Sequence, residues 1–198
     1  MTALQTQSEV VRLPGSIDRP AAEAAVRALL IAFGENPDAE HLRRTPHRVA
    51  NSFAELLTPE PFEFTTFANE ENYDQLVLAR DIPFRSLCMH HLLPFAGVAH
   101  VGYLPSHRIV GLSKLARIVE RFAAGLQVQE RLTKQVAGCL TDRLRPRGVG
   151  VVLEAEHQCM TLRGVRAHDS RTTTSALEGH LREDAAARQE FFALIRSS

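Results

Sequence analysis

The pattern of apolar and polar residues predicts two helices near the start of the chain. After Asp18, apolar side chains recur at positions i, i+3, i+4 and i+7, which is the spacing of one helix face. Asp18 can cap this helix at its N-terminus, and Pro20 lies near the first helical position. A second helix is predicted to begin with Thr45 as its N-cap and Pro46 at its first position.

From about residue 75 onward, the pattern predicts both short strands and helices. The elements predicted there are strands at 75–82, 97–104, 149–155 and 160–166, two helices within 112–144 that break at Ala124–Gly125, and a last helix at 181–196. Two pairs of strands therefore flank a helical pair. A parallel sheet would need regular alternation of strand and helix, so this order favours an α+β fold with an antiparallel sheet.

A single domain suits a chain of 198 residues. Residues 1–17 are polar and aperiodic, and we expect a flexible N-terminal arm there, followed by one domain over 18–198. Within that domain, 18–74 is the predicted helical part and 75–198 the core. No stretch resembles a secretory signal, and none approaches the roughly 20 apolar residues that span a bilayer. We therefore expect a soluble, cytoplasmic protein with no membrane partner.

Charge and cysteine content narrow the classes of function. The 23 Lys and Arg residues balance the 23 Asp and Glu residues, so no global charge attracts the chain to nucleic acid or to an anionic membrane. A polyanionic ligand would need a local cluster of basic side chains. Three cysteines are too few for a disulfide scaffold, and their odd number points to a reducing compartment or a metal site.

A candidate metal site combines two distant stretches of the chain. Cys88 and His91 are three residues apart, as in a metal-binding knuckle. Far downstream, His157 and Cys159 would point to the same side of an extended segment. Two thiolates with one or two imidazoles suit zinc, which accepts sulfur and nitrogen ligands. The alternative is an ordinary core position, because buried cysteines are more often inert apolar residues, as we interpret Cys139.

The number of ligands would decide what such a metal does. Three protein ligands leave a position for water and mark a catalytic site, whereas four mark a structural one, and the sequence permits either. His90 and His91 are adjacent, so it is sterically awkward for both to reach the same ion. The spare imidazole could then act as an acid or a base near neutral pH.

A second candidate site is the start of the helix predicted after Gly111. Ser113 can cap this helix, and Lys114 and Arg117 lie one turn apart on its polar face. A helix N-terminus flanked by two cations can bind phosphate, although the spacing alone favours an ordinary solvated face. Glu130 begins the next helix, where an acidic residue is common, and it matters only if that helix end faces the metal pocket.

Six stretches of the sequence together resemble the GTP cyclohydrolase I family. They are TPHRVA at Thr45–Ala50, SLCMHHLLPFAGVAHVGYLP at Ser86–Pro105, IVGLSKLARIVERFA at Ile109–Ala123, LQVQERLT at Leu126–Thr133, EHQCMTLRGV at Glu156–Val165, and TTTSALEG at Thr172–Gly179. The resemblance implies a tunnelling fold with an antiparallel four-stranded sheet and a helical pair between the strand pairs. It also implies a homodecamer whose active sites lie at subunit interfaces.

The resemblance also implies roles for individual residues. Cys88, His91 and Cys159 would bind one zinc ion per subunit and leave a site for water. His90 and His157 would serve as acid and base. Glu130, with help from Gln129, would hold the edge of the guanine ring. The triphosphate contacts would be Ser113, Lys114, Arg117 and Arg163, together with Arg48 from a neighbouring subunit.

The activity implied is zinc-dependent hydrolysis of GTP to 7,8-dihydroneopterin triphosphate and formate. Zinc-bound hydroxide would attack purine C8, the resulting formamide would be hydrolysed, and the ribose would rearrange and close the new ring. This is the first step of pterin and tetrahydrofolate biosynthesis, or a step that a paralogue supplies to a specialised pathway. Two residues depart from the family pattern: Met89 stands where a glutamate is usual, and Asn51 replaces a lysine of some members.

Other classes of protein remain to be weighed against this one. A zinc-stabilised assembly module without activity would be expected to lack His90, His157 or Glu130, and all three are present. A related nitrile reductase of the tunnelling fold would use a cysteine nucleophile and NADPH without zinc, which the combination of Cys88 and Cys159 argues against. Nucleic-acid binding is disfavoured by the balanced charge.

Overall fold

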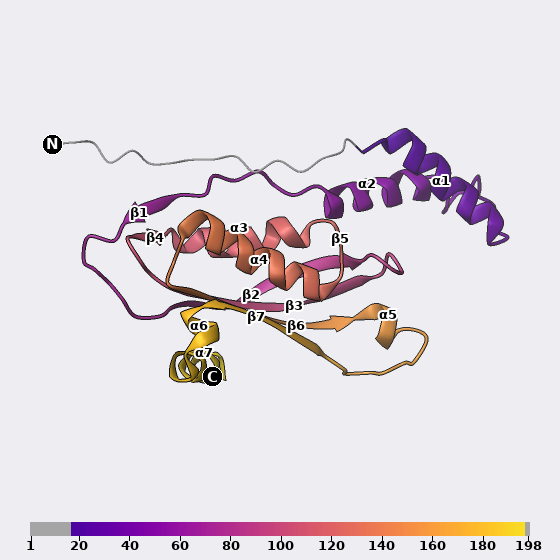
Figure 1. Ribbon diagram of the computed structural model, residues 1–198. Helices are drawn as coiled ribbons and strands as arrows, with labels where there is room; N and C mark the ends of the chain where they lie inside the picture. Colours follow the sequence, from indigo (N-terminus) through magenta and orange to yellow (C-terminus); the bar gives the residue numbers. More distant parts are fainter. Residues whose placement is uncertain (1–16, 197–198) are drawn as a thin grey trace. The chain divides into compact units, whose positions relative to one another are not determined.

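The computed structural model describes residues 17–196, so the arm expected at 1–17 lies almost entirely outside the described residues (Figure 1). The described residues fall into two compact units, 17–59 and 60–196. We call them the helical unit and the sheet unit, and describe each by itself. The sequence placed the change from helical part to core at residue 74, whereas the division lies between Pro59 and Glu60.

The helical unit contains α1 (Arg19–Ala32) and α2 (Thr45–Leu57). As predicted, Asp18 caps α1, because its carboxylate accepts a hydrogen bond of 2.9 Å from the backbone N–H of Ala21. The cap predicted for α2 is wrong by one residue. Arg44 is the N-cap, Thr45 is already helical, and no side chain caps this end. A proline in the first turn costs nothing there, since those N–H groups have no partner within the helix.

A five-stranded sheet forms the centre of the sheet unit, with the strand order β5-β2-β3-β6-β7. The strands are β2 (Val77–Cys88), β3 (Pro94–Leu104), β5 (Leu126–Gln127), β6 (Gly148–His157) and β7 (Thr172–Gly179). All neighbours are antiparallel except the two-residue β5, which runs parallel to β2. A separate two-stranded sheet pairs β1 (Thr66–Ala68) with β4 (Arg108–Val110).

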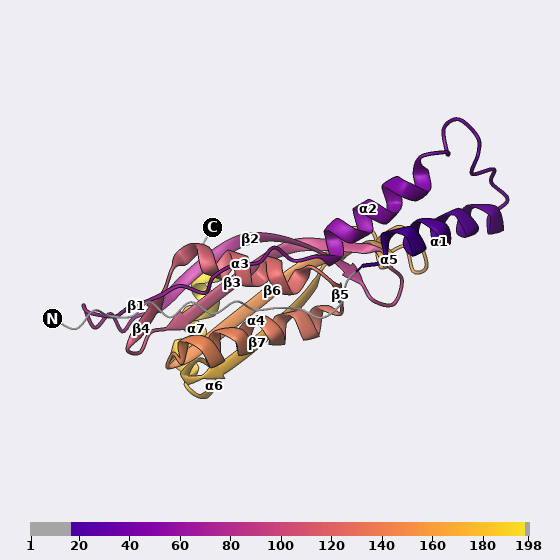
Figure 2. The same cartoon turned by 90° about the horizontal axis from the view of Figure 1, so that it is seen from above.

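Helices cover both faces of this sheet (Figure 1). On one face α3 (Leu112–Ala123) and α4 (Gln129–Leu144) run side by side along the strands, as Figure 2 shows from above. On the other face lie α6 (His180–Glu183) and α7 (Ala185–Arg196). The short α5 (Gln158–Thr161) follows β6 at the end of the sheet. The prediction of an α+β tunnelling fold with a helical pair between two strand pairs is confirmed, but the sheet has five strands and not the expected four, because the short β5 pairs with β2 at its edge.

The main core lies between the sheet and the helical pair. The apolar residues at helical spacing on the two helices are buried: Leu115, Ile118 and Val119 on α3 and Leu132, Val136 and Leu140 on α4 are all fully enclosed. A smaller core lies on the opposite face, where Phe191 of α7 packs against the sheet. Gly102 and Gly150 are paired across β3 and β6, and a Cβ at Gly150 would come within 2.8 Å of the Phe191 ring. This pair of glycines therefore makes room for the aromatic ring.

The strand predicted at 160–166 is wrong. The chain forms α5 and then a turn there, with positive φ angles at Gly164 and Arg166, and β7 begins only at Thr172. The apolar residues that suggested alternation, Leu162 and Val165, are 67% and 75% exposed, so burial does not hold them in a strand. Among the described residues, no helix is long and apolar enough to cross a membrane.

The sheet unit contains one buried cation with a costly environment. Arg121, in the last turn of α3, is only 4% exposed, and its Nε and Nη2 atoms have no hydrogen-bond partner among the described residues. Burial lowers the pKa of its guanidinium, because the charged form loses solvation there. A buried polar group without a partner costs on the order of 1–3 kcal/mol.

We therefore expect Arg121→Met to stabilise the protein. Methionine keeps the length of the aliphatic chain and removes the desolvated charge, which raises the free energy of unfolding by about 1 kcal/mol or more. Urea unfolding followed by circular dichroism measures the change. Lys134→Met, which removes an exposed charge from α4, is the matched control and should change little. A lower unfolding midpoint for Arg121→Met would show that an acceptor outside the described residues pairs with the guanidinium.

Candidate metal centre and nucleotide site

The turn between β2 and β3 presents the first two candidate ligands. Cys88 ends β2, and its backbone N–H donates to the carbonyl of Leu93 at 2.8 Å. The N–H of Leu92 donates back to the carbonyl of Cys88 at 2.8 Å, and Leu92 has a positive φ of 56°. This tight turn keeps the Cys88 side chain buried at the strand end and lifts His91 into an exposed position above it.

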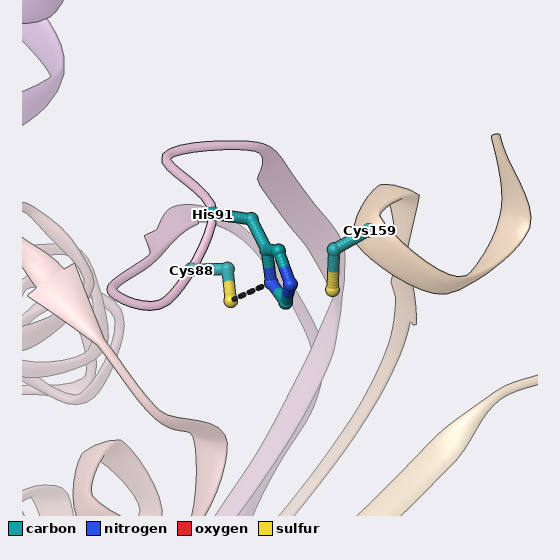
Figure 3. Close-up of side chains that lie close together, drawn as sticks. All are labelled: Cys88, His91 and Cys159. Atoms are coloured by element: carbon teal, nitrogen blue, oxygen red, sulfur yellow. Dashed lines mark hydrogen bonds between the residues drawn. The ribbon is translucent and has the colours of Figure 1, made fainter. Parts of the chain in front are cut away.

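Cys159 reaches the same point from the far side of β3. β6 pairs with β3 so that His157 lies opposite Phe95, which places α5 next to the β2–β3 turn. The prediction that His157 and Cys159 share one extended segment is wrong, because His157 ends β6 whereas Cys159 lies in α5. The helical turn nevertheless points its thiol toward the other two side chains (Figure 3).

The three side chains form a compact cluster of possible ligand atoms. The sulfur atoms of Cys88 and Cys159 and a ring nitrogen of His91 all lie within 4.8 Å of one another. Cys88 Sγ is 3.6 Å from His91 Nδ1 (Figure 3). Burial raises the pKa of the Cys159 thiol, and the neighbouring Cys88 raises it further. Two thiolates this close repel each other without a cation between them, so the donor set fits a divalent ion such as zinc.

Both predicted acid–base histidines lie beside this cluster. His90 is exposed in the turn, with its Nδ1 atom 3.8 Å from Cys88 Sγ. His157 is half-buried, and its ring stacks on Phe95 with the ring centres 4.6 Å apart and the planes 3° from parallel. Burial lowers the pKa of His157, and the negative charge of Glu130 opposes that shift.

The start of α4 supplies Gln129 and Glu130 to the same region. Glu130 is exposed in the first helical turn, whereas Gln129 is only 2% exposed. The side chain of Gln129 contacts His157, with its Oε1 atom 2.7 Å from His157 Nε2. Arg163, a predicted phosphate contact, follows α5 in the chain, and its charge favours the Cys159 thiolate.

The other predicted phosphate contacts lie elsewhere along α3. Ser113 is exposed in the first turn, and the prediction that it caps the helix is wrong, because Gly111 is the N-cap and no side chain caps this end. At 1.5 Å per residue, Ser113 lies on the order of 15 Å along the helix from Ala123. Ala123 is the residue whose carbonyl accepts a 2.7 Å hydrogen bond from Ser86, which lies two residues before Cys88 in β2.

Lys114 and Arg117 lie with Ser113 in the N-terminal half of α3. Within a single copy of the chain, these three residues are therefore apart from the metal cluster. Arg48 lies exposed on α2 in the helical unit. In the same unit, Asn51 accepts a 2.9 Å hydrogen bond from Arg19 and contacts His47. Met89 is 41% exposed in the β2–β3 turn.

Phe95 is a residue of the site that motif reasoning missed. It lies in a recognisable stretch, but its contact with His157 depends on the register between β3 and β6, and no local pattern reveals that register. Thr133 and Thr174 were missed for the same reason, since they meet only when α4 lies over β7.

Taken together, the fold and the cluster define a tunnelling-fold protein with a possible Cys–His–Cys metal centre between a hairpin turn and a short helix. The family model described as GTP cyclohydrolase I matches residues 22–196. The chain belongs to the GTP cyclohydrolase I family.

Curated relatives agree with this assignment. A protein named GTP cyclohydrolase 1 from Thermobifida fusca (strain YX) is 52% identical over 92% of this chain and 90% of its own length. Proteins of the same name from Mycobacterium ulcerans (strain Agy99) and Streptomyces coelicolor are 50% and 52% identical, over 98% and 91% of this chain and 98% and 92% of their own lengths. Among solved structures, an archaeosine synthase QueF-Like in its apo form matches with a TM-score of 0.43 and 15% identity, over 53% of this chain and 94% of its own.

The cluster predicts which cysteines the protein needs in order to retain a metal ion. Cys159→Ala removes one of three donors and should abolish binding of a stoichiometric metal ion, measured by elemental analysis after exhaustive dialysis. Cys139→Ala is the matched control, because Cys139 lies on α4 and is absent from the cluster, and it should keep the metal. Full metal content in Cys159→Ala would mean that the ligands are other residues.

Proposed function

We propose that this protein hydrolyses GTP to 7,8-dihydroneopterin triphosphate and formate. The observation that carries the proposal is the Cys88–His91–Cys159 cluster with His90 and His157 beside it, in a chain about half identical to enzymes named GTP cyclohydrolase 1. The product would enter pterin and tetrahydrofolate biosynthesis in the cytoplasm, or the specialised pathway of a paralogue.

Zinc is the proposed metal, held by Cys88, His91 and Cys159. Two soft sulfur donors and one imidazole match its preferences, and three protein ligands leave a coordination position open. When bound, zinc supplies Lewis-acid activation of water at neutral pH. The buried Cys88 and the half-buried Cys159 fix two corners of the site from opposite sides of β3, so the third donor, His91, can close it with little rearrangement.

His90 and His157 are the proposed acid–base residues. Opening the five-membered ring breaks the C8–N9 bond, and the departing nitrogen must receive a proton. Hydrolysis of the remaining formamide breaks the C8–N7 bond and needs a second proton transfer. Imidazoles exchange protons readily near neutral pH. His90 lies beside Cys88, and His157 is two residues from Cys159 in the chain, so both would be near a C8 atom held at the metal.

Glu130 is the proposed guanine-reading residue. A carboxylate can accept two hydrogen bonds from the ring N1–H and the exocyclic amine of guanine. Adenine lacks that pair of donors and would leave the carboxylate desolvated and unpaired, which makes discrimination strong. The position fits, because Glu130 follows Gln129 in the first turn of α4, and the side chain of Gln129 contacts His157.

A second copy of the chain is proposed to complete the phosphate site. Arg163 follows α5, the helix that contains Cys159, but Ser113, Lys114 and Arg117 lie toward the other end of α3. A neighbouring copy in a homodecamer would bring its own α3 N-terminus, or its Arg48, against the triphosphate. Helix N–H groups and guanidinium groups are both good ligands for such an anion.

Incubation of the metal-loaded protein with GTP tests this function. Formate and a pterin that fluoresces after oxidation should appear in a one-to-one ratio. Removal of the metal with a chelator should abolish both products, and zinc should restore them. A metal-loaded protein that releases no formate from GTP would exclude the proposed activity.

Glu130→Ala tests the proposed recognition of guanine. We expect GTP affinity to fall by about 10- to 200-fold, which corresponds to one lost charged hydrogen-bond pair of roughly 1.5–3 kcal/mol. Isothermal titration of the metal-loaded variant measures the affinity. Glu120→Ala, at an exposed position of α3, serves as the control for lost negative charge. Unchanged GTP affinity in Glu130→Ala would assign recognition of the base to other residues.

A further inference from the structure

The amide of Gln129 has only one possible orientation. Its Nε2 atom lies 3.0 Å from the carbonyl oxygen of Leu153 and 2.9 Å from that of Thr172, and both of these oxygens can only accept. If the amide were flipped, its own oxygen would face two other oxygens. The Nε2 atom is therefore the donor to the strands, and Oε1 is the atom that faces His157.

A closed set of hydrogen bonds reinforces this orientation. Thr133 donates its hydroxyl hydrogen to the backbone carbonyl of Gln129 at 2.7 Å. Thr174 Oγ1 lies 2.6 Å from Thr133 Oγ1 and must therefore donate to it, because the Thr133 hydrogen is already used. Thr174 is then free to accept from Gln129 Nε2 at 3.1 Å. The circuit joins α4 to β7 and holds the amide in place.

The contact between Gln129 and His157 fixes which ring nitrogen carries hydrogen. Gln129 Oε1 can only accept, so at 2.7 Å His157 Nε2 must be the donor. Phe95 lies against the face of the same ring, with a centre-to-centre distance of 4.6 Å. Gln129 thus fixes which edge of the imidazole faces α4, and Phe95 fixes the plane of the ring. Nδ1 is the nitrogen left for a ligand.

The side chain of Gln129 has no group left with which to read a base. It is 2% exposed, its N–H donors are used by Leu153, Thr172 and Thr174, and its oxygen is used by His157. Any help that it gives to catalysis must pass through the residues it contacts. His157 is the one among these that lies beside the metal cluster and is proposed to transfer a proton.

We propose that Gln129 is a positioning residue that holds the imidazole of His157 with Nε2 as hydrogen donor and Nδ1 toward the substrate, an inference that rests on the proposed function. It acts on the rate of the reaction and not on recognition of guanine. The role differs from that of its neighbour Glu130, which is exposed and available to a ligand.

A double-mutant cycle on the metal-loaded enzyme tests this proposal. Gln129→Leu should lower kcat for GTP by about 10- to 100-fold, the range seen when a hydrogen-bonded support of a site residue is removed, and should leave KM within about 2-fold. In a His157→Ala background, Gln129→Leu should lower kcat by less than about 2-fold, because its effect passes through the missing imidazole.

Thr141→Val is the control for disturbance of α4. It removes a hydrogen bond to Glu178 farther along the same helix and outside the circuit, so it should leave kcat within about 2-fold. If Gln129→Leu does not fold, Gln129→Asn keeps the amide but is one methylene too short to reach His157, and it should reproduce the loss of kcat.

Two kinetic results would overturn the proposal. Equal losses of kcat from Gln129→Leu in both backgrounds would show that Gln129 acts independently of His157. A large rise in KM with unchanged kcat would make it a base-reading residue. If the unaltered enzyme did not convert GTP at all, the proposed function would fail first.

The positioning can also be tested without turnover. The ¹⁵N NMR spectrum of histidine-labelled enzyme should contain a protonated Nε2 signal that disappears in His157→Ala and shifts in Gln129→Leu. A His157 signal that is the same with and without Gln129 would exclude the contact.

Discussion

The double pairing of β3 is the constraint on which the site depends. Phe95 of β3 lies opposite Ser86 of β2 on one side and opposite His157 of β6 on the other. Cys88 and Cys159 each lie two residues beyond these partners, so the two antiparallel registers bring the sulfur atoms together. Side chains alternate between the two faces of a strand. A shift of one residue in either register would therefore move one cysteine away from the other and separate the ligand atoms.

The same pairing also explains why the environment of each ligand differs. Cys88 closes a long strand against the main core and is buried, whereas His91 stands exposed in the turn, and Cys159 lies between these extremes in a one-turn helix. Without a metal, burial and the neighbouring Cys88 raise the pKa of the Cys159 thiol. A bound cation would lower this pKa and favour the thiolate forms of both cysteines. The fold therefore brings together groups whose negative charges are balanced only when an ion is bound.

Local patterns predicted the helices well and the end of the sheet badly. The apolar stripes of α3 and α4 repeat with the helical period over three turns or more, and burial against the sheet follows from them directly. Residues 160–166 alternate like a strand but have no neighbour to pair with, so α5 and a turn with Gly164 at positive φ form there. Short alternating stretches become strands only where another strand accepts their hydrogen bonds, which is a property of the whole sheet.

The sequence by itself determined the chemistry available to this protein: two cysteines and neighbouring histidines suited to zinc, a balanced charge, and motifs that identify the family. Only the tertiary structure decided how those groups are used. It separates Ser113 from the metal cluster along α3. It also uses the side-chain amide of Gln129 in hydrogen bonds to β6, β7 and His157. Residue identity limits what a side chain can donate or accept, but partners distant in the chain meet only through strand register and helix packing.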